Sequence, residues 1–136
     1  MLIWLVEDSE ADELLIRLAI GRDGLECEFR VSPDGEKAIA FLDVLDTHAN
    51  QAPPQVILVD LNLPRKGGAT VLERIRQSAK CAGVPVIIIS SSDSATDRAQ
   101  VSRLGASYFQ KPLELAEFMK LGPLVRGMVT NWQPQG

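Results

Sequence analysis

This 136-residue chain carries a small set of residues that could do chemistry together if the fold assembles them. They are Glu7, Asp8, Asp60, Ser90 and Lys111. Carboxylates held side by side repel one another, so they cost free energy unless a cation compensates their charge. Oxygen ligands with no histidine or cysteine nearby favour Mg²⁺ or a similar hard cation such as Mn²⁺. A carboxylate beside such a cation and a lysine can accept a phosphoryl group as an acyl phosphate.

Taken singly, each of these residues also has an ordinary structural role. Asp8 or Ser9 could cap a helix, and Asp60 could belong to a turn. The serines from Ser90 onward could form a capping loop, and Lys111 could be a solvated surface residue. Their combination at the ends of neighbouring strands is what favours a chemical role.

Short β-branched runs alternate along the chain with amphipathic stretches. Strands are predicted at Leu2–Glu7, Cys27–Val31, Val56–Asp60, Val84–Ile89 and Ser107–Gln110. Three of these runs are almost continuously apolar, which is typical of strands buried on both faces of a parallel sheet. The Cys27–Val31 run is mixed, which is typical of an edge strand.

Helical periodicity fills the intervals between these strands. Apolar residues recur at helical spacing within 11–19, 38–45, 71–79 and, more weakly, 94–104, and Gly21 is predicted to end the first helix. A last helix begins at Leu115, and Gly122-Pro123 is predicted to interrupt it.

Strict alternation predicts a single α/β domain, a doubly wound (βα)5 parallel sheet of flavodoxin-like strand order 2-1-3-4-5. We expect this domain to span residues 1–130, with a flexible tail at 131–136 and no output domain. Ligands of such sheets bind outside the carboxyl ends of the first and third strands. Glu7, Asp8 and Asp60 stand at those ends.

Composition excludes several function classes. The net charge of −4 argues against nucleic acid as a direct partner. No apolar run is long enough to span a membrane. Two cysteines are too few for a disulfide framework and fit the reducing cytoplasm. His48 is the only histidine, which removes every multi-histidine metal site.

Four motifs in fixed order, LIWLVEDSEAD, VILVDLNLPRKGG, PVIIISSSD and YFQKP, resemble the receiver domain of two-component response regulators over nearly the whole chain. The resemblance implies that Asp60 is the phosphorylation site. It implies that Asp8 binds Mg²⁺ directly, Glu7 through water, and Asn62 through its backbone carbonyl. Lys111 would then pair with the phosphoryl group.

The same resemblance assigns the switch. Ser90 takes the Ser/Thr switch position, and Tyr108 takes that of the aromatic residue whose rotamer reports activation. Asn62 and Ser92 lie where side chains tune the lifetime of the phosphorylated form. The Lys111–Pro112 bond is expected to be cis, as it often is in this family.

More narrowly, the chain is similar to small receiver-only regulators that serve bacterial phytochrome-type histidine kinases. The long loop before Val56, the DLNLP…G turn and the length support this. The similarity implies a sensor histidine kinase as partner, a downstream protein or phosphotransfer protein as target, a possible homodimer, and no enzymatic activity beyond the chain's own phosphorylation and dephosphorylation.

Other classes fit less well. A haloacid-dehalogenase-type phosphatase needs a second aspartate where Asn62 stands, and a nucleotide- or flavin-binding loop would not carry the acidic EDSEAD sequence. A histidine phosphotransfer module needs its histidine on a helix, whereas His48 lies in a predicted loop. The alternative left open is a receiver-fold binding module that acts without phosphorylation. Loss of Asp8, Asp60 or Lys111 would support it, and all three are present.

Overall fold

The computed structural model describes residues 1–130, so the predicted tail at 131–136 lies outside the described residues. Its strands are β1 (Leu2–Val6), β2 (Glu28–Ser32), β3 (Val56–Asp60), β4 (Val86–Ser90) and β5 (Ser107–Gln110). They form one parallel sheet in the order β2-β1-β3-β4-β5. The predicted fold and strand order are confirmed, and the mixed second strand lies at an edge as expected.

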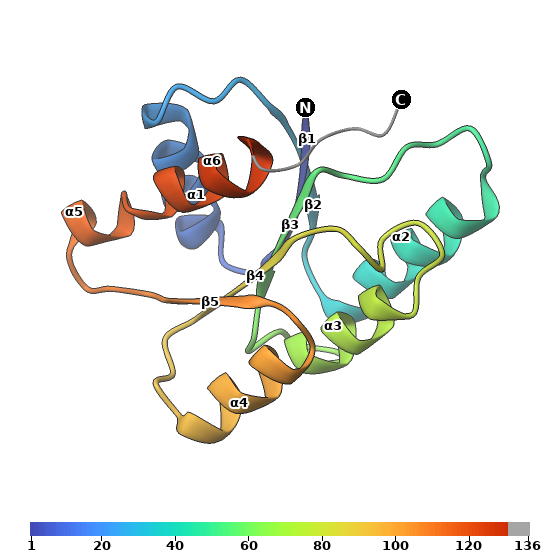
Figure 1. Ribbon diagram of the computed structural model, residues 1–136. Helices are drawn as coiled ribbons and strands as arrows, with labels where there is room; N and C mark the ends of the chain where they lie inside the picture. The colour runs from blue at the N-terminus through green and yellow to red at the C-terminus, as the bar shows by residue number, and fades with distance from the viewer. Residues whose placement is uncertain (131–136) are drawn as a thin grey trace.

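Six helices connect and flank these strands within residues 1–130. They are α1 (Glu10–Arg22), α2 (Gly35–Thr47), α3 (Gly68–Arg76), α4 (Ala95–Arg103), α5 (Leu115–Phe118) and α6 (Leu121–Thr130). Figure 1 shows α1, α5 and α6 on one side of the sheet and α2 and α3 on the other. Val101 of α4 joins the core on the α2 and α3 side. The sheet is therefore the middle of three layers.

Alternate residues of the central strands fill the two cores. In β1, Trp4 and Val6 face the α2 and α3 layer, whereas Ile3 and Leu5 face α1 and α6. This follows from the two-residue side-chain period of a strand. It also explains why these strands are apolar throughout, because both faces exclude water. The Trp4 ring packs edge-on against Phe41 at 4.7 Å between centroids.

The predicted interruption of the last helix occurs, but at a different place. The break falls at Met119 and Lys120, between α5 and α6, and Gly122 and Pro123 lie inside α6. Pro123 is in the first helical turn, where the missing N–H has no intrahelical partner to lose. Gly122 permits close packing, because a Cβ there would lie 2.4 Å from the Ala19 carbonyl oxygen of α1.

Two other local predictions are wrong. Gly21 does not end α1, which continues to Arg22. The Lys111–Pro112 bond is trans, since residues 1–130 contain no cis peptide bond. The trans isomer is the intrinsically favoured one, and the structure reaches the site geometry described below without the less stable isomer.

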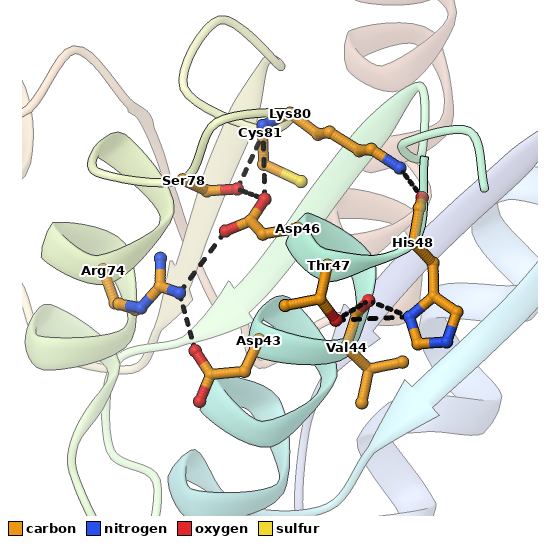
Figure 2. A network of polar contacts seen from close by, with 9 residues as sticks. All are labelled: Asp43, Val44, Asp46, Thr47, His48, Arg74, Ser78, Lys80 and Cys81. Atoms are coloured by element: carbon orange, nitrogen blue, oxygen red, sulfur yellow. Dashed lines mark hydrogen bonds and ion pairs between the residues drawn. The ribbon is translucent and has the colours of Figure 1, made fainter. Parts of the chain in front are cut away.

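A polar network joins the end of α2 to the segment between α3 and β4, on the side of the sheet where the strands begin (Figure 2). We call it the helix-end network, and it comprises the side chains of Asp43, Asp46, Arg74 and Ser78 and the backbone N–H of Lys80. Asp46 is its centre, accepting hydrogen bonds from the Ser78 hydroxyl at 2.7 Å and from Arg74 at 3.4 Å. The network fixes α2 against α3 and the turn that follows it.

No helix within residues 1–130 is both long and apolar enough to cross a membrane. Both cysteines are free thiols, with Cys81 buried and Cys27 half-buried.

Candidate functional site

The carboxyl ends of β1 and β3 bring three acidic residues together. These strands are neighbours, with Val6 paired to Val59, so the residues that follow both positions lie side by side. A carboxylate oxygen from each of Glu7, Asp8 and Asp60 lies within 4.8 Å of the others. The predicted assembly of these three residues therefore occurs. Glu7 and Asp60 are buried, whereas Asp8 is exposed.

The turn from β1 into α1 orients Glu7 inward. Its backbone N–H extends the sheet by donating to the Ser32 carbonyl at 3.1 Å. Its Oε1 accepts from the backbone N–H of Ser9 at 3.0 Å. Ser9 in turn is the N-cap of α1, its hydroxyl accepting from the Asp12 N–H at 3.2 Å. The capping role considered for Asp8 or Ser9 thus belongs to Ser9, which leaves the Asp8 side chain available to a ligand.

Asp60 is fixed by the segment that follows it. Its Oδ1 accepts from the backbone N–H of Asn62 at 2.9 Å, and Leu61 N–H donates to the Ile89 carbonyl at 3.0 Å. The start of α3 packs directly on this backbone, because a Cβ at Gly68 would lie 2.3 Å from the Asp60 carbonyl oxygen. A glycine is needed at this position to keep the Asp60 loop closed.

Lys111 reaches the same place from the end of β5. Its backbone N–H donates to the Ser90 carbonyl at 2.7 Å, which continues the ladder beyond the strand. Its Nζ lies 2.6 Å from Asp12 Oδ2, 2.9 Å from Asp60 Oδ2 and 3.5 Å from Glu7 Oε2. Burial alone would lower the pKa of Lys111, but hydrogen bonds to Asp12 and Asp60 raise it above its usual value. The ammonium is therefore charged at neutral pH.

One cation does not balance these acids. Glu7, Asp8, Asp12, Asp60 and Lys111 form what we call the strand-end cluster. Glu7 Oε2 is buried and accepts no hydrogen bond from any described residue. Burial, with the nearby Asp60 carboxylate adding to it, raises the pKa of Glu7 to about 8. A buried oxygen without a donor, among oxygen-only ligands, fits a hard divalent cation, which would supply the missing positive charge.

The predicted switch residues lie beside this cluster. Ser90 is fully buried at the end of β4, and its hydroxyl accepts from the Ser92 backbone N–H at 3.1 Å. The Tyr108 hydroxyl donates to the Ser92 carbonyl at 2.7 Å. The Arg98 guanidinium stacks on the Tyr108 ring at 4.4 Å, and the Ser92 hydroxyl donates to Asp97 at 3.0 Å. Ser90 and Tyr108 are thus linked through one intermediate residue.

Sequence reasoning missed Asp12, which makes the shortest contact to Lys111 in the site. An acidic residue in the first turn of a helix has a sufficient local explanation in the helix dipole, so nothing in the sequence singled it out. The one available signal was spacing, because Asp12 comes four residues after Asp8, close to the carboxyl end of β1.

Comparison with known proteins identifies the family. The family model described as the response regulator receiver domain matches residues 3–121. The chain is 33% identical to the response regulator Rcp1 of Synechocystis sp. over 131 residues, covering 96% of this chain and 87% of that protein.

Solved structures give the same result. The structure of the phosphorylated cyanobacterial phytochrome response regulator RcpA superposes with a TM-score of 0.82 at 30% identity, covering 96% of this chain and 94% of that one. The Mn²⁺-bound form of Rcp1 gives 0.84 at 29% identity and 99% coverage of both chains. The bacteriophytochrome response regulator RtBRR gives 0.77 at 30% identity, covering 99% of this chain and 81% of that one.

Proposed function

Because this chain belongs to the response regulator receiver family of two-component signalling, we propose that it accepts a phosphoryl group from a sensor histidine kinase onto Asp60. The P–N bond of a phosphohistidine breaks, and a P–O bond to an Asp60 carboxylate oxygen forms. The observation that carries the proposal is the position of Asp60, buried beside two other carboxylates and 2.9 Å from the Lys111 ammonium.

Glu7, Asp8 and Asp60 are proposed to hold Mg²⁺, with the Asn62 backbone carbonyl as a further ligand. The orphaned Glu7 Oε2 supports this, and so does the Mn²⁺ bound in the similar Rcp1 structure. When bound, the cation supplies positive charge to the phosphoryl oxygens.

The chain's own residues complete the transfer. Lys111 already lies at Asp60, so its charge can neutralise a phosphoryl oxygen with little reorganisation. The Ser90 hydroxyl can donate its own hydrogen to that oxygen. The chain is proposed to catalyse only its own phosphorylation and dephosphorylation.

The signal is proposed to leave through Tyr108. When Ser90 turns toward the phosphoryl group, it vacates the space behind it, and its bond to Ser92 shifts. Tyr108, which is bonded to the Ser92 carbonyl, then turns inward and changes the surface made by α4 and β5. Asn62 and Ser92 tune how long this state lasts. The changed surface is read by a downstream protein, by a phosphotransfer protein or by a second copy of the chain.

The kinase is proposed to be of the phytochrome type and the location to be the cytoplasm. The similarity to RcpA and RtBRR, which are described as phytochrome and bacteriophytochrome response regulators, supports the first. The two free thiols support the second.

Intact-mass analysis after incubation with acetyl phosphate tests the central step. The wild-type chain should gain the mass of one phosphoryl group in Mg²⁺, and neither EDTA-treated wild type nor Asp60→Asn should gain it. No gain in Mg²⁺, under conditions that modify a known receiver, would favour a binding module that acts without phosphorylation.

A second measurement tests the switch. Ser90→Ala removes the hydroxyl while keeping a small buried side chain, so it should still be phosphorylated but lose most of the associated change in the Tyr108 environment. That environment can be followed by the fluorine resonance of a fluorotyrosine, since Tyr108 is the only tyrosine. An unchanged response in Ser90→Ala would contradict the coupling.

A further inference from the structure

Three acidic residues occupy the first turn of α1, but only one of them points into the site. Glu10 is exposed, and Glu13 pairs one turn along the same helix with Arg17 at 3.2 Å. Asp12 instead reaches across the fold to Lys111, which lies 99 residues later in the sequence. A general preference for acids at helix N-termini explains all three residues equally. It does not explain the contact that Asp12 makes.

Backbone hydrogen bonds hold both residues of this contact in place. The backbone of Asp12 is held by the Ser9 cap at 3.2 Å, so the helix start sets where its carboxylate lies. Lys111 is held by its backbone bond to Ser90 at 2.7 Å. The side chains of Asp12 and Lys111 are 26% and 15% exposed, so water screens their contact only in part.

Asp12 is not part of the group of carboxylates that could hold the cation. That group consists of Glu7, Asp8 and Asp60. Among residues 1–130, the one ion pair of the Asp12 carboxylate is with the Lys111 ammonium, at 2.6 Å, which is closer than the ammonium lies to Asp60. Its role in the site must therefore be exerted through Lys111.

We propose that Asp12 is a positioning residue for phosphoryl transfer, and that its carboxylate anchors the Lys111 ammonium before the phosphoryl group arrives. The inference rests on the proposed phosphorylation of Asp60. A lysine side chain is long and flexible, and an unanchored ammonium must lose that freedom as the phosphoryl group is transferred. A charge that is already in place stabilises the transferring group without reorganisation.

The ammonium can keep its anchor during the reaction. It has three N–H donors, of which one serves Asp12 and one serves Asp60 in this structure. An arriving phosphoryl oxygen can take the third donor or replace Asp60 as partner. Lys111 can thus follow the phosphoryl group while Asp12 still limits its movement.

The anchor needs an acceptor oxygen more than it needs a charge. The Asp12 carboxylate also adds a negative charge near an anionic phosphoryl donor, which opposes transfer. An asparagine at this position keeps one acceptor oxygen and the same side-chain shape without the charge. An alanine keeps neither. The two substitutions therefore separate positioning from charge.

The test is the rate of phosphorylation by acetyl phosphate at saturating Mg²⁺, followed by intact mass. Asp12→Ala should slow the modification about tenfold. Asp12→Asn should remain within about threefold of wild type. The matched control is Glu10→Gln, which removes an acidic charge from the same helical turn without touching Lys111 and should change the rate less than about twofold.

A second experiment, in a protein that lacks the Lys111 ammonium, shows whether Asp12 acts through the lysine. We expect Lys111→Met to be modified slowly. In that protein, adding Asp12→Ala should change the rate less than about twofold, because there is no ammonium left to position. If Lys111→Met is not modified at all, the comparison of Asp12→Asn with Asp12→Ala decides alone.

Several results would overturn the inference. They are equal slowing by Asp12→Ala and Glu10→Gln, equal slowing by Asp12→Asn and Asp12→Ala, or full slowing by Asp12→Ala in the Lys111→Met background. These failures differ from failure of the proposed function, which would appear as an unmodified wild-type protein. That result would remove the reaction that Asp12 is inferred to assist.

Discussion

Carboxylates contact cationic side chains at both ends of the same sheet, but the two groups differ in how many of their oxygens accept hydrogen bonds. In the helix-end network, Asp46 Oδ1 accepts from Ser78 at 2.7 Å and from the Lys80 backbone N–H at 3.3 Å, while Oδ2 accepts from Arg74 at 3.4 Å. In the strand-end cluster, Lys111 alone serves three carboxylates, and Glu7 Oε2 accepts no bond from the described residues.

The pKa values move in opposite directions for this reason. Burial by itself would raise the pKa of Asp46, but the bonds from Ser78, Lys80 and Arg74 outweigh it and hold that pKa below its usual value. Burial and the nearby Asp60 carboxylate act in the same direction on Glu7 and together raise its pKa to about 8. A network complete in itself stabilises the fold, whereas an incomplete one marks a site built for a ligand.

We expect the largest loss of stability when the helix-end network loses Asp46, the residue at its centre. Asp46→Ala leaves the buried Ser78 hydroxyl and the Lys80 backbone N–H without their acceptor and leaves Arg74 with Asp43 alone. We therefore expect a loss of about 2–3 kcal/mol in the free energy of unfolding. Urea unfolding followed by circular dichroism measures it. Phosphorylation of the folded fraction should be unaffected, and a loss below about 0.5 kcal/mol would show that the network is dispensable.

The strand-end cluster should behave in the opposite way when no divalent cation is present. In EDTA at pH 7, Glu7→Gln should raise the free energy of unfolding by about 1–2 kcal/mol, because it removes a poorly compensated buried acid. Millimolar Mg²⁺ should stabilise the wild type and stabilise Glu7→Gln much less. Destabilisation of Glu7→Gln in EDTA would contradict the charge imbalance inferred here.

The raised pKa of Glu7 also determines the direction in which the free energy of unfolding changes with pH. The folded pKa of Glu7 exceeds its ordinary value, so the folded state keeps the proton that the unfolded state has lost. In EDTA the stability of the wild type should therefore fall, relative to Glu7→Gln, as the pH rises from about 4.5 toward 8.

The sequence predicted the strand-end cluster better than the helix-end network, for a physical reason. Parallel strands deliver their carboxyl ends to one edge, so strand assignment alone was enough to place Glu7, Asp8 and Asp60 together. Asp46 and Arg74 lie on two different helices, and their pairing depends on how α2 packs beside α3. A charged residue on a helix usually faces solvent, so neither residue stood out.

Tertiary packing also explains one feature that sequence reasoning places wrongly and one that it misses. A glycine followed by a proline was expected to break the last helix, yet Gly122 serves the contact of α6 with Ala19, and the break lies just before it. Asp12 was missed because its helix position accounted for it without the lysine. In each case a local rule gave a sufficient explanation, and a contact distant in sequence determined the outcome.

A smaller effect is expected in acid and concerns Asp46 again. Its folded pKa lies below the ordinary value, so its stabilising contribution is complete above pH 3.8 and is lost as the pH falls through the folded pKa. Between pH 5 and pH 3, wild type should lose on the order of 1 kcal/mol more than Asp46→Asn. Parallel urea titrations of the two proteins measure the difference. Equal losses would mean that Asp46 titrates alike in both states.

The smallest loss of stability should come from changing Asp43, the exposed acid of the helix-end network. Asp43 makes the shorter of the two contacts to Arg74, at 2.7 Å against 3.4 Å for Asp46, but its side chain is 62% exposed against 16%. Water screens an exposed pair and holding two side chains in place costs entropy, so Asp43→Asn should cost no more than about 0.5 kcal/mol. The same urea titration measures it beside Asp46→Asn, the matched substitution at the buried position. If Asp43→Asn cost as much as Asp46→Asn, distance rather than burial and completeness would govern these contacts, and the contrast between the two ends of the sheet would lose its basis.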